Sequence, residues 1–181
     1  MKPTLSSRDL SLLQPAFREK VELLLERCAD QGAVLKPFFT VRGPAVQAKL
    51  WCQSRSPLQI QAQANALEAA GASWLASLLQ VSFAHTGPKV TNALPGLSWH
   101  QWGEAIDCYV AGPQGQAIWN ARHPGYRLYA ETAVELGLEA GGLWKRFPDA
   151  VHVQWQAHGS PLRAGLTWAE IDSTLRARFS A

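Results

Sequence analysis

The chain has 181 residues, of which 47% are hydrophobic and 17% charged, ordinary usage for a globular protein with one sizeable core. Its formal net charge of +3 includes no dense run of Lys or Arg, which argues against a nucleic-acid partner. No apolar run reaches the roughly 20 residues that a membrane helix needs, and the first residues contain no hydrophobic signal core. We therefore expect synthesis in the cytoplasm, no signal peptide and no membrane insertion.

In the first half of the chain, the patterns predict a helix, a strand and two further helices. The strand is Phe38–Arg42, whose alternation puts Phe38, Thr40 and Arg42 on one face. Residues 56–86 read as helical, with Ser56 as N-cap, Pro57 at the first helical position and a second short amphipathic segment after Gly71. The first long helix carries the apolar stripe Phe17, Val21, Leu24, Leu25 and Cys28.

The second half predicts two more strands and two more helices. The strands are 104–110 and 151–155, and the helices are 126–136 and a final one opened by the capping box from Thr167 to Glu170. The stretch Gly112–Gly125 reads as a long loop. Together, these strands and helices predict an α+β fold, in which a small, mostly antiparallel sheet is flanked by helices, in a single domain over residues 1–181.

The three cysteines, Cys28, Cys52 and Cys108, are odd in number and far apart, and they form no C-x-x-C motif. This pattern argues against a disulfide framework and against a cysteine zinc site. It favours synthesis in a reducing compartment. Cys108 is expected on the strand face opposite Asp107.

Two histidines, His100 and His152, lie in short patterned segments that also contain Asp107 and Asp149. Together these residues provide three metal-ligand side chains and one spare carboxylate, which is what a hydrolytic zinc site needs. Strand alternation puts Asp107, His152 and Arg42 where apolar residues would otherwise be expected, and pairing in one sheet would point them into one cleft. The spacing differs from the helical H-E-x-x-H motif, so hydrogen-bonded histidines without a metal remain the alternative.

Further residues around these positions form extended patterns. The first is S-x-H-x-x-G-x-A-x-D, made by Ser98, His100, Gly103, Ala105 and Asp107. The second is Asp149, His152 and Gln154, and an upstream segment contains Arg42, Gln47, Leu50, Trp51, Gln53 and Arg55. These patterns, from about Ser7 to Trp155, resemble the zinc peptidases of peptidoglycan. That family includes D-alanyl-D-alanine carboxypeptidases and dipeptidases and the L-alanyl-D-glutamate endopeptidases of phage endolysins.

The resemblance implies the fold called D-Ala-D-Ala carboxypeptidase or hedgehog-like, and a role for each matching residue. His100, Asp107 and His152 would bind Zn²⁺, and Asp149 would be the general base. Arg42 would stabilise the oxyanion of the tetrahedral intermediate. Ser98, Gln154 and Trp144 would support the site.

The chain departs from the family pattern at two places. Residues 56–86 make it longer than the compact endolysin members, and we interpret them as a helical insertion, either for packing or as a wall beside the cleft. Leu143 stands where many relatives have Asp, in a position that we do not assign to the metal.

The function implied is hydrolysis of a peptide bond in peptidoglycan stem peptides. Asp149, where many carboxypeptidase relatives have Glu, favours an endolysin-type L-alanyl-D-glutamate endopeptidase. The alternatives are a D-alanyl-D-alanine carboxypeptidase and a non-catalytic, zinc-containing wall-binding module. The resemblance to phage enzymes also implies release to the wall by a separate holin-type partner, and we expect a monomer.

Overall fold

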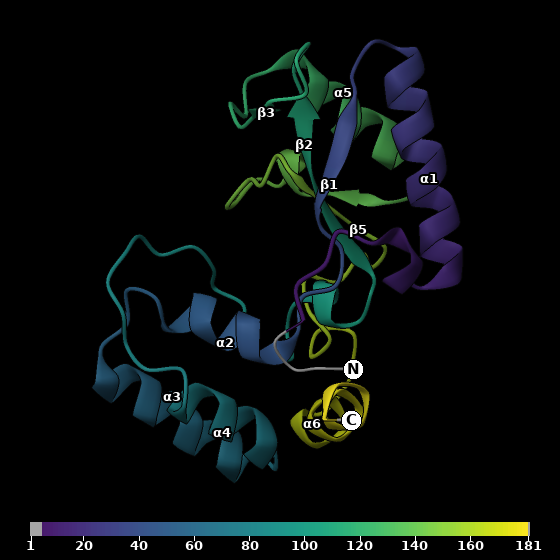
Figure 1. The fold of residues 1–181 in the computed structure, drawn as a ribbon. Coiled ribbons are helices and arrows are strands. Elements are labelled where there is room, and N and C mark those ends of the chain that lie inside the picture. Colours follow the sequence, from purple (N-terminus) through teal and green to yellow (C-terminus); the bar gives the residue numbers. More distant parts are fainter. Residues whose placement is uncertain (1–4, 181) are drawn as a thin grey trace. The chain divides into compact units, whose positions relative to one another are not determined.

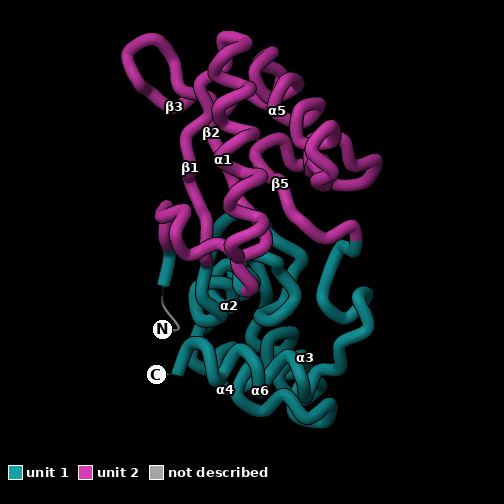
Figure 2. Tube along the Cα trace, turned by 90° about the vertical axis from the view of Figure 1, so that its right-hand side faces the viewer, with its two compact units in different colours: residues 1–6, 42–101, 158–181 teal, residues 7–41, 102–157 magenta. Residues whose placement is uncertain are grey.

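The computed structural model describes residues 5–180. The N-terminal segment was predicted to contain no signal core, and its first four residues lie outside the described part. The chain divides into two compact units, which Figure 2 colours separately. Unit 1 contains Arg42–Gln101 and the segment from His158 onward, and unit 2 contains Ser7–Val41 and Trp102–Ala157. The single domain over residues 1–181 stays a prediction.

Unit 2 is built on an antiparallel sheet (Figure 1). The strand order is β1-β2-β5-β4, and β3 pairs with the last two residues of β2, beyond the part of β2 that pairs with β5. Among residues 5–180, the four strand pairs of this sheet are all antiparallel. The strands are β1 (Leu35–Phe39), β2 (Ala105–Ala111), β3 (Ala117–Ile118), β4 (Glu139–Ala140) and β5 (His152–Gln154). The predicted α+β class with a small antiparallel sheet is confirmed.

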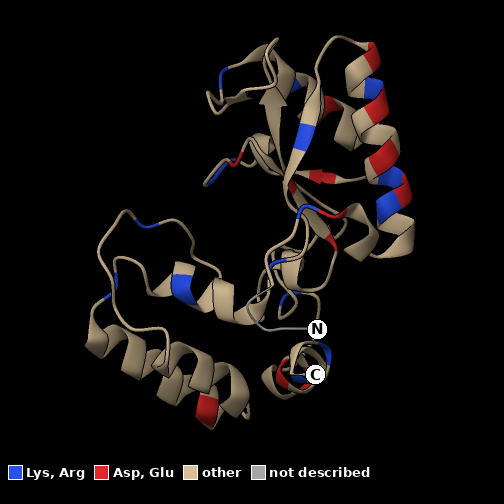
Figure 3. Cartoon of the chain, in the orientation of Figure 1, with Lys and Arg blue, Asp and Glu red and all other residues tan. Residues whose placement is uncertain are grey.

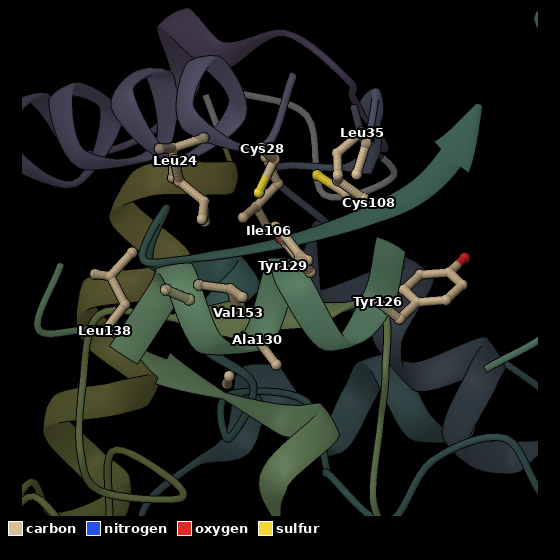
Figure 4. Close-up of a cluster of buried hydrophobic side chains, with 14 of the residues drawn as sticks. Leu24, Cys28, Leu35, Ile106, Cys108, Tyr126, Tyr129, Ala130, Leu138 and Val153 are labelled. Carbon is tan, nitrogen blue, oxygen red and sulfur yellow. The ribbon is translucent and has the colours of Figure 1, made fainter. Parts of the chain in front are cut away.

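Two helices, α1 (Pro15–Asp30) and α5 (Pro124–Glu135), form the apolar core of unit 2 together with the sheet. Figure 4 shows their side chains meeting those of the sheet, with Leu24 and Cys28 from α1, Tyr129 and Ala130 from α5, and Ile106 and Cys108 from β2. Alternation along β2 therefore turns Asp107 to the opposite face, as predicted. Burial raises the pKa of Cys108 to about 12, which keeps it a neutral core thiol. Two short 3-10 helices, η1 (Leu10–Leu12) and η3 (Gly141–Leu143), complete the unit.

The strand predicted at Phe38–Arg42 is shifted, and this prediction is wrong in its boundaries. β1 ends at Phe39, and its register with β2 slips between Pro37 and Phe39, where proline offers no N–H to the ladder. Beyond it, the backbone N–H and the hydroxyl of Thr40 both donate to the carbonyl of Ser7, at 2.7 and 3.0 Å. The chain thus leaves the sheet for the N-terminal segment, and Arg42 is not a strand residue.

The stretch Gly112–Gly125 is not one long loop, because it contains β3, which forms a hairpin with β2. The hydroxyl of Tyr126 donates to the carbonyl of Ile118 at 2.7 Å and fixes the hairpin to the start of α5.

Unit 1 is helical, with α2 (Pro44–Cys52), α3 (Pro57–Ala69), α4 (Ser73–Gln80), η2 (Trp99–Gln101) and α6 (Trp168–Phe179). The capping boxes opened by Ser56 and Thr167 are both present, so the predicted starts of α3 and α6 are confirmed. A buried hydrogen bond of 2.8 Å from the backbone N–H of Leu75 to Asp172 Oδ1 joins α4 to α6. That residues 56–86 are an insertion stays a prediction.

Charges and cysteines are distributed as in an ordinary globular protein. Acidic and basic side chains are interspersed along α1, whereas α3 and α4 carry few of either (Figure 3). All three cysteines are free and buried. Within residues 5–180, none of the helices has both the length and the apolar character needed to cross a membrane.

Candidate metal centre

Asp107 and His152 face each other across two neighbouring strands. The register of β2 and β5 makes them direct partners, and directly opposed side chains share one sheet face. His152 Nδ1 lies 2.9 Å from Asp107 Oδ1, and the two side chains are only 11% and 10% exposed. The sheet thus holds an imidazole and a carboxylate together, largely shielded from water.

Two of the predicted supporting residues contact His152 in this unit. Gln154 Oε1 lies 3.0 Å from His152 Nε2. The ring of Trp144 packs against the imidazole with centroids 5.3 Å apart, and its indole N–H donates to Glu139 Oε2 at 3.4 Å. These contacts fix the orientation of the imidazole from two sides.

The electrostatic environment of His152 is negative. Burial alone would favour the neutral ring, but the hydrogen bond to Asp107 and the charges of Asp107 and Asp149 outweigh it and raise the pKa of His152. Surroundings that stabilise an added proton also stabilise a bound cation, because both bring positive charge to the same place.

Asp149 is positioned by main-chain hydrogen bonds next to η3. Its N–H donates to the carbonyl of Gly141 at 2.9 Å, and its carbonyl accepts from the N–H of His152 at 3.2 Å. The turn packs so closely on η3 that a Cβ at position 141 would lie 2.6 Å from the Asp149 carbonyl oxygen and 3.1 Å from His152 Cβ. Glycine at this position is therefore what allows Asp149 and His152 to stand where they do.

We expect Gly141→Ala to destabilise the protein by about 1–3 kcal/mol, the usual cost of forcing an extra carbon into a packed site. Gly142→Ala is the matched control, because its nearest neighbour, Ala150 Cα, would be 3.5 Å away in ordinary contact. Chemical denaturation of both variants measures the difference in the free energy of unfolding. Equal free energies of unfolding for the two variants would show that residues 149–152 can move to accept the extra carbon without loss of stability.

The other predicted site residues, Arg42, Ser98 and His100, lie in unit 1. The backbone N–H of Arg42 donates to the carbonyl of His100 at 3.3 Å, and its guanidinium lies 3.4 Å from the hydroxyl of Ser98. Arg42 Nε donates to Gln47 Oε1 at 2.9 Å, and Gln47 in turn donates to the carbonyl of Ala93 at 2.7 Å. His100 itself is buried in η2.

Among the described residues, His100, Asp107 and His152 form a group of side chains that could hold a metal ion. Two imidazoles and one carboxylate are a donor set typical of catalytic zinc, which keeps a further position open. Asp149 is not in this group. The donor chemistry and the negative surroundings of His152 both fit a divalent cation.

Residues 91–155 match a protein-family model described as D-alanyl-D-alanine carboxypeptidase. The matched segment contains His100, Asp107, Asp149 and His152, but neither Arg42 nor the helices of residues 56–86. The resemblance to this peptidase family is confirmed.

Two individual proteins are also similar to the chain. The peptidoglycan L-alanyl-D-glutamate endopeptidase CwlK of Bacillus subtilis is 37% identical over 75 residues, which is 38% of this chain. The match covers 45% of that peptidase, so the chain spans less than half of the length of this curated relative. The crystal structure of the Serratia marcescens L-Ala D-Glu endopeptidase ChiX is 19% identical, covers 84% of this chain and 90% of its own, and has a TM-score of 0.43.

Sequence patterns did not predict the contacts that Gly141, Gln156 and Glu104 make at the site. The close contact of Gly141 with Asp149 had only the Gly141-Gly142 pair as a signal. Gln156 donates from its side chain to Glu104 Oε2 at 2.8 Å, beside the strand end that carries Gln154. Neither Gln156 nor Glu104 belongs to a motif, so no local pattern could have found this contact.

Proposed function

We propose that the protein is a metal-dependent peptidase that hydrolyses a bond in peptidoglycan stem peptides, the L-alanyl-D-glutamate bond above all. One observation carries the proposal. The segment that matches the peptidase family supplies two imidazoles and a carboxylate suited to a metal, together with a separate carboxylate at Asp149.

His100, Asp107 and His152 would hold the ion, with Zn²⁺ as the proposed metal. When bound, such an ion supplies Lewis-acid activation of water and of the scissile carbonyl. The carboxylate of Asp149 would take a proton from the attacking water and later deliver it to the leaving nitrogen. The guanidinium of Arg42 would stabilise the developing oxyanion, an effect worth about 3–4 kcal/mol for a well-placed donor.

The choice of bond rests on two observations. Asp149 stands where many carboxypeptidases of the family have Glu, and the B. subtilis relative is named an L-alanyl-D-glutamate endopeptidase. The description of the matching family model favours a D-alanyl-D-alanine carboxypeptidase as the second candidate. A non-catalytic wall-binding module is disfavoured, because binding alone needs neither Asp149 nor Arg42. The holin-type partner and the monomeric state stay predictions.

Mass spectrometry of purified peptidoglycan, digested with and without a zinc chelator, tests the proposal. Chelator-sensitive fragments with a free amine on D-glutamate are the expected result. Loss of a terminal D-alanine would instead establish the carboxypeptidase with the same site. Absence of any product from zinc-loaded protein would overturn the peptidase proposal and favour the binding module.

A further inference from the structure

The side-chain amide of Gln154 is held at both ends, and this fixes which way it points. Its Nε2 lies 2.5 Å from the main-chain carbonyl of Gln156, and its Oε1 lies 3.0 Å from His152 Nε2. A carbonyl oxygen can only accept, so the NH₂ end of the amide must face Gln156. The flipped amide would place two acceptor oxygens 2.5 Å apart. Gln154 therefore presents its oxygen to the imidazole.

An amide oxygen facing a ring nitrogen determines the position of the ring proton. Because Oε1 can only accept, His152 Nε2 must carry the hydrogen, and in the neutral ring the lone pair is then on Nδ1. Nδ1 is the atom that lies 2.9 Å from Asp107 Oδ1. Two acceptors at that separation need positive charge beside them, a proton or a metal ion.

We propose that Gln154 is a positioning residue that holds His152 in the Nε2–H tautomer and so makes Nδ1 the metal-binding atom. This inference rests on the proposed metal site and names the atom and the residue that prepare it. Ligand histidines commonly donate their second ring N–H to an oxygen that fixes the tautomer and the ring plane.

The acceptor that orients Gln154 is itself fixed to the neighbouring chain. The side chain of Gln156 donates to Glu104 Oε2 at 2.8 Å, and the N–H of Trp155 donates to the carbonyl of Glu104 at 2.9 Å. Glu104 directly precedes β2, the strand that carries Asp107. Gln154 is only 3% exposed, so water has little room to replace its oxygen. Hydrogen bonds to Glu104 thus connect the segment after His152 to the strand that carries Asp107.

The test combines ¹⁵N NMR of His152 with zinc affinity in full-length protein, using Gln154→Leu, Gln154→Glu and Gln156→Leu. In the metal-free wild type at alkaline pH, the neutral ring should be mainly Nε2–H. Gln154→Leu removes the acceptor and should give a mixture of tautomers with zinc Kd raised about 10–100-fold. Gln154→Glu keeps an acceptor oxygen for Nε2–H but loses the NH₂ group that bonds to the Gln156 carbonyl, so it should restore the tautomer only in part. Gln156→Leu keeps the main-chain carbonyl but loses the contact with Glu104, so it should shift the tautomer less than Gln154→Leu does.

The two readouts separate the failure of this inference from that of the proposed function. A wild-type ring that is mainly Nδ1–H, or a Gln154→Leu variant with unchanged tautomer and zinc Kd, would overturn the role of Gln154 even in an active peptidase. Wild-type protein that binds no zinc would overturn the metal site. The tautomer shift in Gln154→Leu would still support the positioning role in that case.

Discussion

Replacing Asp149 by Asn should lower turnover at least about 100-fold, the usual scale of general-base loss, with one equivalent of zinc still bound. The side chain loses its proton-accepting carboxylate but keeps its size. The hydrogen bonds that hold the turn, from Asp149 N–H to Gly141 and from His152 N–H to the Asp149 carbonyl, belong to the main chain and persist. Steady-state kinetics on a stem peptide measures the turnover, and mass spectrometry measures the bound zinc. Asp149→Ala should show the same loss of turnover with zinc retained.

Asp30→Asn is the matched control, because it makes the same chemical change at an exposed position at the end of α1. It should leave both turnover and zinc unchanged. Undiminished hydrolysis by Asp149→Asn would remove Asp149 from the mechanism. Loss of zinc by that variant would instead make Asp149 a ligand, and the proton would need another acceptor.

The strands that carry ligands were predictable because their signal is local. Alternation along β2 separates Asp107 from Ile106 and Cys108, and the latter two side chains belong to the core of unit 2, as expected. The same rule failed at Arg42. Pairing of Thr40 with Ser7 and the register slip after Pro37 are decided by residues distant in sequence, and no alternating pattern records them.

In the candidate site, too, features set by neighbouring residues were predictable from the sequence, and features set by distant residues were not. The histidines and aspartates were visible as short patterns of ligand types, and the partnership of Asp107 with His152 follows from strand register. Gln154 was predicted as a supporting residue, but the way it would support the site was not predictable, because the orientation of its amide depends on a main-chain carbonyl and on the contact between Gln156 and Glu104. Every residue has such a carbonyl, so its role leaves no mark in the sequence.

Replacing His152 by Ala should abolish stoichiometric zinc binding and, with it, hydrolysis. The variant loses a ligand atom outright and leaves Asp107 buried without its imidazole partner, whereas Gln154→Leu only misorients the ligand. Zinc at 100 times its Kd should stabilise the wild type by about 2.7 kcal/mol, because it binds the folded state alone. The variant should show no such stabilisation.

Chemical denaturation with and without zinc measures this difference independently of any substrate. His85→Ala is the control, because that imidazole is exposed and its removal should leave the zinc-dependent stabilisation intact. Retention of one zinc by His152→Ala would exclude it from the ligand set. The positive charge that the 2.9 Å separation of His152 Nδ1 from Asp107 Oδ1 requires would then be a proton rather than a metal ion.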